Sequence, residues 1–515
     1  MTRRSLALAL GSGLIQILSF PLSGGFSFGF LAWVSLVPLF LAIEGKTLKQ
    51  AFLLGGLSGM VAFAGLLYWI VYCMDIYTDM PFIVAIMVFL LLVLIMAALQ
   101  GLFAVLFNWL SMKIPLFSLV LAPCIWVALE LLRTYFPLGG FPWDLMGISQ
   151  HRILPLIQIA ELTGVYGISF AIVLVNLALA RAISARSRSQ PAWREIILSL
   201  AIVLLLAIFG YLRIFQVDRA FQDQPSLKVA IVQGNIDQAV KWDNDLFWRN
   251  HFIHVRLSEE VLLEKTDLLI WPEAAITTYL KDEWERRSAL IRSISKFDAY
   301  FLVGSITRIH DNNRQYVYNS AYLFAPYAEE LLGRYDKIHL VPFGEYVPMK
   351  KLLFFADVIA GGATGDTDPG SEVYVFDTGK FRFGCVICFE VTLPDLVRRF
   401  KKAGAEFMTT ITNDAWFGKT SAPYQHHANV ILRCVENRIY LARSAQTGIS
   451  SIVDPVGRVV TKSRIYEPAS LRGEIRLSSY NTIYTRFGDW FAYLVSIITV
   501  MGIVISATRS RKNKF

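Results

Sequence analysis

Charged residues are scarce in this chain, at 17% of 515 residues, whereas 55% of the residues are hydrophobic. An ordinary soluble domain has about 25% charged residues. The mean hydropathy of +0.48 points the same way. A purely soluble enzyme is therefore disfavoured.

Cysteine is also rare, and its five positions do not describe a disulfide framework. Cys73 and Cys124 lie in or beside apolar stretches and Cys434 lies in a helical run, so packing is their expected role. Cys385 and Cys388 form a CxxC pair, which allows a thioredoxin-like interpretation. Redox CxxC motifs open a helix, however, whereas FRFGCVICFE alternates and is rich in Val, Ile and Phe. This pattern predicts a buried strand that runs into a turn.

The formal net charge of +9 is confined to particular parts of the chain. Residues 1–216 carry 12 Lys/Arg against 7 Asp/Glu, and the tail after Thr508 adds 4 basic residues and no acid. The stretch 217–508 holds 33 residues of each sign and is neutral. The basic excess therefore belongs to the apolar part, where it orients membrane spans, and no nucleic-acid partner is expected.

Long apolar runs are abundant, and a bilayer core needs about 20 such residues per helix. We predict about eight spans, near residues 5–21, 26–43, 52–74, 82–110, 115–132, 155–180, 196–215 and 489–507. Arg3 and Arg4 before the first run resemble the start of a signal peptide, but further spans follow at once. The predicted domains are a seven-helix transmembrane part (1–216), an extramembrane catalytic domain (217–488), and a last helix with a basic tail (489–515).

Loop charges predict the orientation. With the N-terminus inside, 13 basic residues fall on the inner side: Arg3, Arg4, Lys46, Lys49, Lys113, Arg181, Arg186, Arg188, Arg194, Arg509, Arg511, Lys512 and Lys514. The outer loops carry only Arg133 and Arg152. Residues 217–488 are therefore expected outside, which in a bacterium is the periplasm.

The extramembrane stretch alternates strand and helix patterns, which favours a mixed sheet layered with helices. Strands are expected at 227–236, 266–275, 299–308, 318–326, 406–414 and in the paired segments after Leu441, besides FRFGCVICFE. A helix is expected between the first two of these strands, ending near Lys265, and further helices are expected at 282–296, 393–403 and 423–437.

Three polar residues stand beside or just beyond apolar runs, where such sheets place their chemistry. Glu273 follows LLIWP, Cys388 follows FGCVI, and Lys337 lies in RYDKIHLVPFGEYVP. Together they offer an acid, a thiol and a cation, as acyl transfer through a thioester requires. Glu273 would take the thiol proton, because a free thiol is mostly protonated at neutral pH.

The oxyanion of the tetrahedral intermediate would be stabilised by Lys337 and by the backbone N–H of Phe389. No histidine is needed for this chemistry. We therefore do not propose a catalytic Cys-His pair with His339, His426 or His427. His426 and His427 lie near a predicted helix start, and we expect them to be a capping or surface pair.

WPEAA, YDKIHLVPFGEYVP and CFE, in this order, resemble the Glu-Lys-Cys motifs of the nitrilase (carbon-nitrogen hydrolase) superfamily. The membrane part, the GGFPW loop at 139–143, TNDAWFG at 412–418 and the single C-terminal span are similar to the apolipoprotein N-acyltransferase family within it. The resemblance covers nearly the whole chain.

This resemblance implies an αββα sandwich on the periplasmic face of a bacterial inner membrane. The implied reaction takes an acyl chain from a phospholipid, through a thioester on Cys388, to the α-amino group of the diacylglyceryl-cysteine of an apolipoprotein. Glu273 would be the base and Lys337 the oxyanion donor. No cofactor or metal is implied, and a monomer is expected.

The resemblance also implies supporting and substrate-binding roles. The residues concerned are Glu345, Glu390, Phe389 and Trp242 as supporting residues, and Trp143 and Trp416 as substrate-binding residues. Phe389 stands where the family leads us to expect tyrosine. Structural ion pairing or capping is the other interpretation of the two glutamates, and an interfacial anchor is the other interpretation of Trp143.

The aromatic, glycine-rich stretch 352–365 could be a membrane-dipping lid or a packed cover, and Glu130 could line a lipid entry. Two other functions stay open. One is a membrane-tethered amidase that hydrolyses a small amide. The other is a transporter or scaffold, although the spans are nearly free of the ionisable residues that transport usually requires.

Overall fold

The computed structural model describes residues 1–77, 80–137, 139–187, 191–241, 246–279, 283–311, 314–328, 330–342, 344–346 and 367–512. The chain divides into two compact units. The first comprises Met1–Val71, Ile83–Phe215 and Phe487–Phe515, and the second comprises Tyr72–Phe82 and Gln216–Arg486. Each unit is described by itself.

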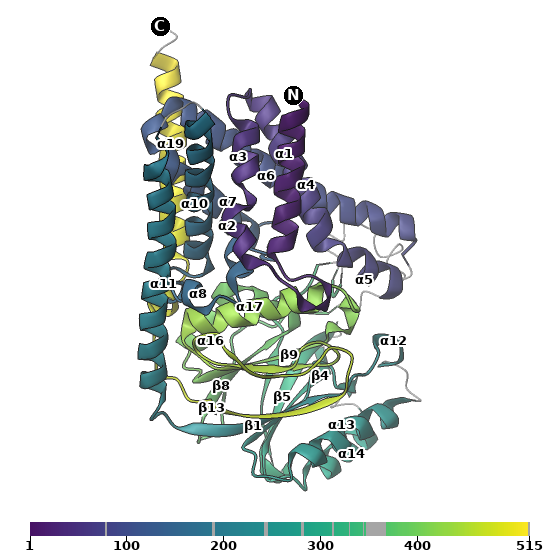
Figure 1. Cartoon of the computed structure of the whole chain (residues 1–515). Coiled ribbons are helices and arrows are strands. Elements are labelled where there is room, and N and C mark those ends of the chain that lie inside the picture. The colour runs from purple at the N-terminus through teal and green to yellow at the C-terminus, as the bar shows by residue number, and fades with distance from the viewer. Residues whose placement is uncertain are drawn as a thin grey trace. The chain divides into compact units, whose positions relative to one another are not determined.

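The first unit is helical (Figure 1). Its long helices are α1 (Arg3–Ser19), α4 (Leu48–Leu67), α6 (Phe82–Lys113), α7 (Ser118–Tyr135), α10 (Val165–Ser187), α11 (Trp193–Phe221) and α19 (Trp490–Lys512). Capping boxes start two of them: Thr2 with Ser5 at α1, and Thr47 with Gln50 at α4. Such caps satisfy amides that the first turn leaves without a partner.

Six helices in the described part of the chain are long and apolar enough to cross a membrane, so the predicted count of eight spans is not confirmed. The first predicted span is a helix of 17 residues. The second breaks into η2 (Gly29–Leu31), α2 (Ala32–Ser35) and α3 (Val37–Ile43). At this break, Oδ1 of Asn176 in α10 accepts hydrogen bonds from the backbone amides of Leu36 and Val37, at 2.7 and 3.1 Å. A break in an apolar helix is tolerated where a neighbouring helix supplies such partners.

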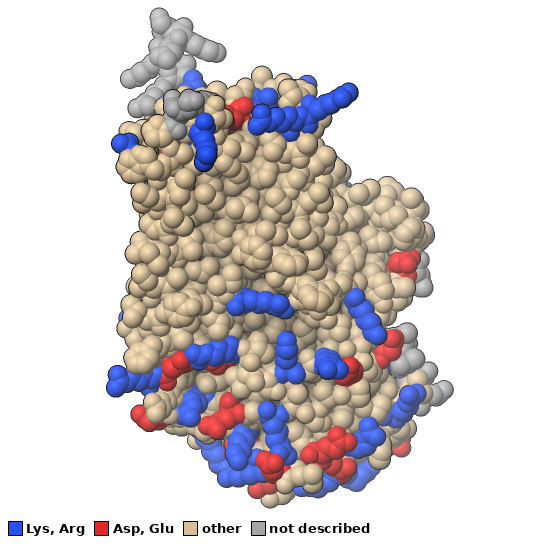
Figure 2. All heavy atoms as spheres, viewed as in Figure 1, with Lys and Arg blue, Asp and Glu red and all other residues tan. Residues whose placement is uncertain are grey.

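The surface of this helical unit is nearly free of charged side chains along most of its length on the face shown in Figure 2. Lys and Arg gather at the end where the N-terminus lies. A charge-free band bordered by basic residues is typical of a membrane-spanning bundle.

The second unit contains two mixed sheets. The first has the order β13-β1-β2-β4-β5-β6, with β3 paired to β4. Its strands are β1 (Ser226–Gln233), β2 (Leu268–Ile270), β3 (Ile276–Tyr279), β4 (Tyr300–Asp311), β5 (Arg314–Phe324), β6 (Leu331–Asp336) and β13 (Ala469–Arg476). The second has the order β12-β11-β10-β9-β8-β7. Its strands are β7 (Val375–Asp377), β8 (Arg382–Ile387), β9 (Phe407–Thr412), β10 (Leu441–Ala445), β11 (Ser451–Val453) and β12 (Val459–Lys462).

Helices cover the outer face of each sheet (Figure 1). They are α13 (Phe247–Val261) and α14 (Trp284–Ile294) on the first sheet, and α16 (Pro394–Lys402) and α17 (Ala422–Asn437) on the second. The sheets face each other, and the Ser444 hydroxyl of β10 donates to the Val232 carbonyl of β1 at 2.9 Å. The αββα sandwich that the family resemblance implies is confirmed.

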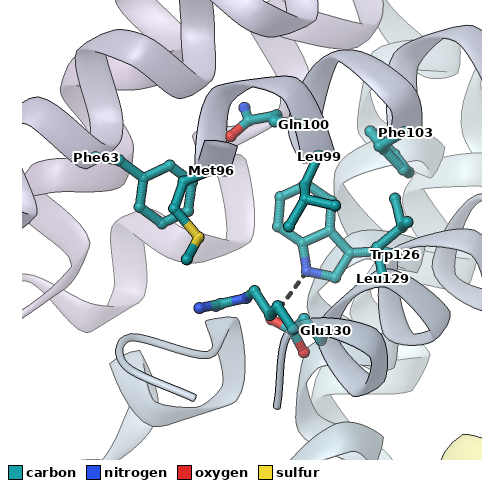
Figure 3. A pocket seen from close by; sticks show the side chains of 9 residues that line it. Phe63, Met96, Leu99, Gln100, Phe103, Trp126, Leu129 and Glu130 are labelled. Carbon is teal, nitrogen blue, oxygen red and sulfur yellow. Dashed lines mark hydrogen bonds between the residues drawn. The ribbon is translucent and has the colours of Figure 1, made fainter. Parts of the chain in front are cut away.

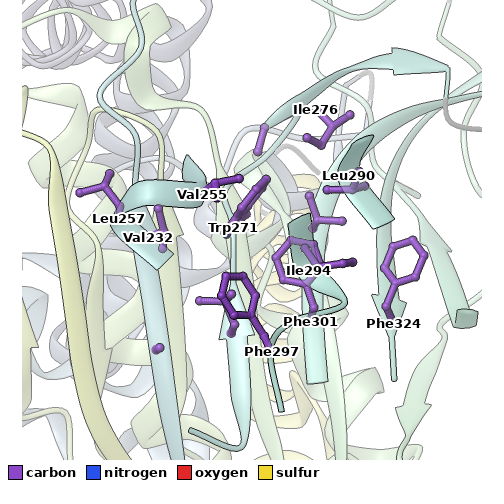
Figure 4. Close-up of a cluster of buried hydrophobic side chains, with 14 of the residues drawn as sticks. Val232, Val255, Leu257, Trp271, Ile276, Leu290, Ile294, Phe297, Phe301 and Phe324 are labelled. Carbon is purple, nitrogen blue, oxygen red and sulfur yellow. The ribbon is translucent and has the colours of Figure 1, made fainter. Parts of the chain in front are cut away.

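The hydrophobic core between the first sheet and its helices is built around Trp271 (Figure 4). The indole N–H of Trp271 donates to the Ser258 hydroxyl of α13 at 2.8 Å, which satisfies the one polar atom of a fully buried ring. Trp271 lies two residues before Glu273, so this packing fixes the chain where β2 ends.

Candidate active site

The three predicted catalytic residues lie at or just beyond strand ends and come together in the second unit. Glu273 follows β2, Lys337 directly follows β6, and Cys388 directly follows β8. The ammonium of Lys337 is 3.9 Å from Glu273 Oε1. Both charges act on the Cys388 thiol, Glu273 raising its pKa and Lys337 lowering it. The structure therefore places a carboxylate, a cation and a thiol in one buried site.

The Glu273 carboxylate is held on both oxygens. The Asn319 side chain donates to Oε1 at 2.7 Å, and the Asn413 backbone N–H donates to Oε2 at 2.7 Å. The next residue, Ala274, has a left-handed φ of 44°. Gly304 of β4 packs beneath this turn, where an added Cβ would lie 2.7 Å from the Glu273 Cα. The turn and the two hydrogen-bond donors orient the Glu273 carboxylate into the site, and Glu273 is buried there, with 7% of its surface exposed.

Lys337 is held by Glu345. Its Nζ lies 2.9 Å from Glu345 Oε1 and 2.8 Å from Oε2, and Lys337 is 1% exposed. Burial lowers the pKa of Lys337, but the carboxylates of Glu345 and Glu273 outweigh burial and hold it above the ordinary value. Asn319 also donates to Glu345 Oε1, at 3.1 Å, and so bridges the two acids. Lys337 is thus a fixed positive charge at neutral pH.

Cys388 opens the short helix η7 (Cys388–Thr392) with a left-handed φ of 54°. A non-glycine residue held in this conformation costs about 1–3 kcal/mol, and such residues cluster at active sites. Burial, together with Glu273, raises the pKa of the Cys388 thiol to about 12. The thiol is therefore protonated at neutral pH, so a base must remove its proton before it can act as a nucleophile.

The second cysteine of the CxxC pair has a different place. Cys385 lies within β8 and is 0% exposed, and both cysteines are free. The prediction that FRFGCVICFE is a buried strand running into a turn is confirmed by β8 and η7.

Glu390 connects the two segments that carry Lys337 and Cys388. Its Oε1 accepts hydrogen bonds from the backbone amides of Ile338 and His339, at 2.8 and 3.0 Å. Its Oε2 accepts one from the backbone amide of Ile387, at 2.7 Å. The capping interpretation of Glu390 from the sequence thus describes its contacts. Through them it sets the spacing of the ammonium and the thiol.

The other predicted residues are placed as follows. The Phe389 ring stacks on His339, with centroids 5.9 Å apart. The Trp416 carbonyl, in η8 (Asp414–Phe417), accepts from the Cys73 thiol at 3.0 Å, and its ring lies 5.2 Å from that of Tyr77. These contacts are internal to the second unit, to which residues 72–82 belong. Trp242 and the stretch 352–365 lie outside the described residues.

Trp143 is 0% exposed within the first unit, and its ring stacks on Phe141. The interfacial-anchor interpretation is therefore wrong, since an anchoring ring reaches the lipid headgroups. Glu130 of α7 lines a cavity of about 40 Å³ in the same unit (Figure 3). Its Oε1 accepts from Trp126 and from the Met146 amide, and its Oε2 has no hydrogen-bond partner among the described residues.

The histidine pair was predicted wrongly. His426 and His427 lie in α17 beyond its N-cap Ser421 and its first turn, and are 0% and 7% exposed, so they are neither a capping pair nor a surface pair. The His426 Nε2 lies 3.1 Å from the Cys388 carbonyl oxygen. Helical periodicity could not reveal this contact, because the partner is 38 residues away in sequence.

Sequence reasoning also missed Lys241 and Asn319. Lys241, at the end of α12 (Gln238–Lys241), is 1% exposed and donates to the Glu273 carbonyl oxygen at 2.9 Å. Burial lowers the pKa of Lys241 to about 8. The one signal for Asn319 was a polar residue within the apolar strand pattern YNSAYLF.

A buried thiol with a carboxylate and an ammonium at strand ends of an αββα sandwich defines an enzyme of the carbon-nitrogen hydrolase class. Residues 228–482 match the carbon-nitrogen hydrolase family model, and residues 12–178 match the model of the apolipoprotein N-acyltransferase N-terminal domain.

The chain is similar to several named proteins. An apolipoprotein N-acyltransferase of Geobacter metallireducens is 40% identical over 495 residues, which is 95% of this chain and 93% of the relative. One of Rickettsia prowazekii is 32% identical, with 96% of each chain covered. Saccharomyces cerevisiae Nit3, of the nitrilase superfamily, aligns at a TM-score of 0.36 and 21% identity over 49% of this chain and 90% of its own. The chain belongs to the apolipoprotein N-acyltransferase family, and it is a multi-pass membrane protein.

Proposed function

We propose that this protein transfers an acyl chain from a membrane phospholipid to the α-amino group of the N-terminal diacylglyceryl-cysteine of apolipoproteins. The observation that carries the proposal is the convergence of Glu273, Lys337 and Cys388 in a chain whose relatives are named for this activity. A thioester on Cys388 is the proposed intermediate.

In the first half-reaction, Cys388 Sγ attacks an ester carbonyl carbon of the phospholipid while Glu273 takes the thiol proton. The negative charge that develops on the carbonyl oxygen is stabilised by the Lys337 ammonium and the Phe389 backbone N–H. The C–O bond then breaks, and the lysophospholipid leaves as an alcohol after taking the proton from Glu273. The acyl chain remains as a thioester.

In the second half-reaction, the neutral α-amino nitrogen of the acceptor attacks the thioester carbonyl. Glu273 removes a proton from that nitrogen, and the C–S bond breaks. The proton returns to sulfur, which restores Cys388 and releases the amide product. Because Glu273 is used in both directions, holding it by Asn319 and by the Asn413 amide serves both steps.

We further propose that the second unit faces the periplasm from a bacterial inner membrane. The support is the 13 basic residues predicted inside against two outside. A cysteine at exposed Asp311, next to the undescribed Asn312, should react with an impermeant maleimide on spheroplasts. A cysteine at exposed Lys49 should react only after lysis, and the reverse pattern would overturn the orientation and the function with it.

The experiment that tests the function is intact-protein mass spectrometry after exposure to phospholipid. A hydroxylamine-labile mass increase of one acyl chain is expected, and addition of a diacylglyceryl-cysteine peptide should discharge it onto the peptide amine. An enzyme that forms no adduct, or releases the chain only to water, would contradict acyl transfer to an amine. Release to water alone would favour the membrane-tethered amidase.

A further inference from the structure

A buried network of three charged or titratable side chains lies behind the nucleophile. Asp414 of η8, His426 of α17 and Arg443 of β10 are each 0% exposed. None of them takes part in the acyl-transfer steps above. Burying two opposite charges is costly unless their partners are close, so the contacts of this network are informative.

The contacts run from Arg443 to Cys388. Arg443 Nη2 donates to Asp414 Oδ2 at 2.7 Å and lies 3.1 Å from His426 Nδ1. Asp414 Oδ1 also lies 3.1 Å from His426 Nδ1. On the other side of the ring, His426 Nε2 lies 3.1 Å from the carbonyl oxygen of Cys388. The Thr412 hydroxyl donates to Asp414 Oδ1 at 2.9 Å and completes the anchoring of that carboxylate.

The contacts and the charges around the ring together indicate how His426 is protonated. A carbonyl oxygen only accepts hydrogen bonds, so His426 Nε2 must carry a proton. His426 Nδ1 lies 3.1 Å from both Asp414 Oδ1 and Arg443 Nη2, and in the neutral ring it accepts from the arginine, because the carboxylate oxygen has no proton to donate. Burial and the charge of Arg443 lower the pKa of His426 by more than the Asp414 carboxylate raises it, which favours the neutral ring. Asp414 in turn holds Arg443.

The carbonyl that receives this hydrogen bond belongs to the residue with the strained backbone. Cys388 has φ 54°, and its side chain is aimed by that conformation and by the turn from β8 into η7. Without a donor on its carbonyl, the peptide could relax toward an ordinary conformation and move the sulfur. A misplacement of 1 Å at a reacting atom can cost about 100-fold in rate.

We propose that His426, held by Asp414 and Arg443, is a positioning residue that fixes the Cys388 backbone in the geometry required for acylation. The inference rests on the proposed function, in which Cys388 is the nucleophile. It also gives a role to Thr412 and Asp414 of the TNDAWFG motif, which the acyl-transfer steps leave unused.

The test uses the full-length purified protein with phospholipid in mixed micelles, and follows the acyl adduct by intact mass. His426→Leu removes the donor and should slow adduct formation at saturating phospholipid by about 100-fold. The half-saturating phospholipid concentration should not change, because the donor does not touch the lipid. His426→Gln supplies an amide donor at a similar reach and should restore most of the lost rate.

His427 is the matched control. It lies next to His426 in the same helix, is also buried, and its Nε2 lies 2.9 Å from the Ser451 hydroxyl. His427→Leu should therefore lose a comparable buried hydrogen bond while forming the adduct at the native rate. A folded His426→Leu protein that acylates as fast as His427→Leu, or a Gln variant as slow as Leu, would overturn the positioning role.

Asp414→Asn keeps the test decisive if His426→Leu does not fold. The charge of Asp414 raises the pKa of Cys388, so electrostatics alone predicts faster acylation when it is removed. The positioning role predicts slower acylation, because Arg443 loses its anchor, and an unchanged or faster rate would overturn it. If the native protein itself forms no adduct, the proposed function fails instead.

Discussion

The Tyr335 hydroxyl donates to both carboxylate oxygens of Glu390, at 2.9 and 3.0 Å. Both residues are buried, Tyr335 at 1% and Glu390 at 0% exposure. Glu390 also accepts hydrogen bonds from three backbone amides. Through them it attaches the segment after Lys337 to the end of β8. Because the Glu390 carboxyl group is buried and accepts several hydrogen bonds, the stability of the site depends on whether this group is protonated.

Glu390 should make the second unit less stable as pH rises through the weakly acidic range. Burial raises the pKa of Glu390 from 4.5 to about 7, against the lowering effect of its hydrogen bonds. Between these values the native state holds a proton that the unfolded chain has lost, so the free energy of unfolding falls as pH increases. The expected fall is about 3 kcal/mol as pH rises from 4.5 through 7, and it levels off about one pH unit above the folded-state pKa.

Thermal unfolding of native protein and Glu390→Gln at several pH values checks this. The native midpoint should drop from pH 4.5 to 7, and the Gln variant should lack most of that drop. A variant that follows the native curve would show that other groups set the pH dependence.

Lys337→Arg should inactivate the protein although the charge is kept. Lys337 is buried between Glu345 and Glu273, and a planar guanidinium cannot direct its charge to one point as a compact ammonium does. Adduct formation should fall by at least about 100-fold. Lys402→Arg, at an exposed position in α16, should be native in rate. An active Lys337→Arg protein would show that a diffuse positive field is sufficient.

Lys241 should also contribute to acylation, through its charge. Its ammonium lies at the Glu273 carbonyl and interacts with Cys388, and its pKa of about 8 means that the charge is lost at mildly alkaline pH. We expect the native adduct rate to decline above pH 8 and Lys241→Met to be about tenfold slower at pH 7 without this decline. Rates of adduct formation between pH 6.5 and 9 measure both effects.

Lys401 provides the matched control. It is also buried, and burial also lowers its pKa to about 8, but its Nζ donates to the Ser478 carbonyl and not to the site. Lys401→Met should keep the native pH profile. A decline above pH 8 that persists in Lys241→Met would assign it to another group.

The sequence was sufficient for features that depend on local pattern. FRFGCVICFE alternates and ends at a polar residue, so the strand and the place of Cys388 beyond it could be predicted. Glu273 and Lys337 could be singled out in the same way, because each stands beside an apolar run.

Features that depend on distant partners could not be predicted. Strand β13 pairs with β1 across more than 200 residues, and its own sequence, ASLRGEIR, has too few apolar residues to mark it as a strand. The break within 26–43 is invisible to hydropathy, because Asn176, which satisfies its amides, is 139 residues beyond Val37. His426 looked like a surface residue for the same reason, since Arg443 and Cys388 reach it from other elements.

The two cysteines of the CxxC pair should differ completely in function. Residues three apart in a strand point to opposite faces, and here Cys385 packs inside β8 while Cys388 stands beyond its end with the charges of Glu273 and Lys337 acting on it. Cys388→Ala should abolish both the acyl adduct and the modification of lipoprotein amines. Cys385→Ala should leave the adduct rate nearly native and cost at most about 1–2 kcal/mol of packing. Intact mass after phospholipid exposure, with a thermal unfolding midpoint for each variant, separates the two effects. Loss of activity in both folded variants would favour a redox pair over a single nucleophile.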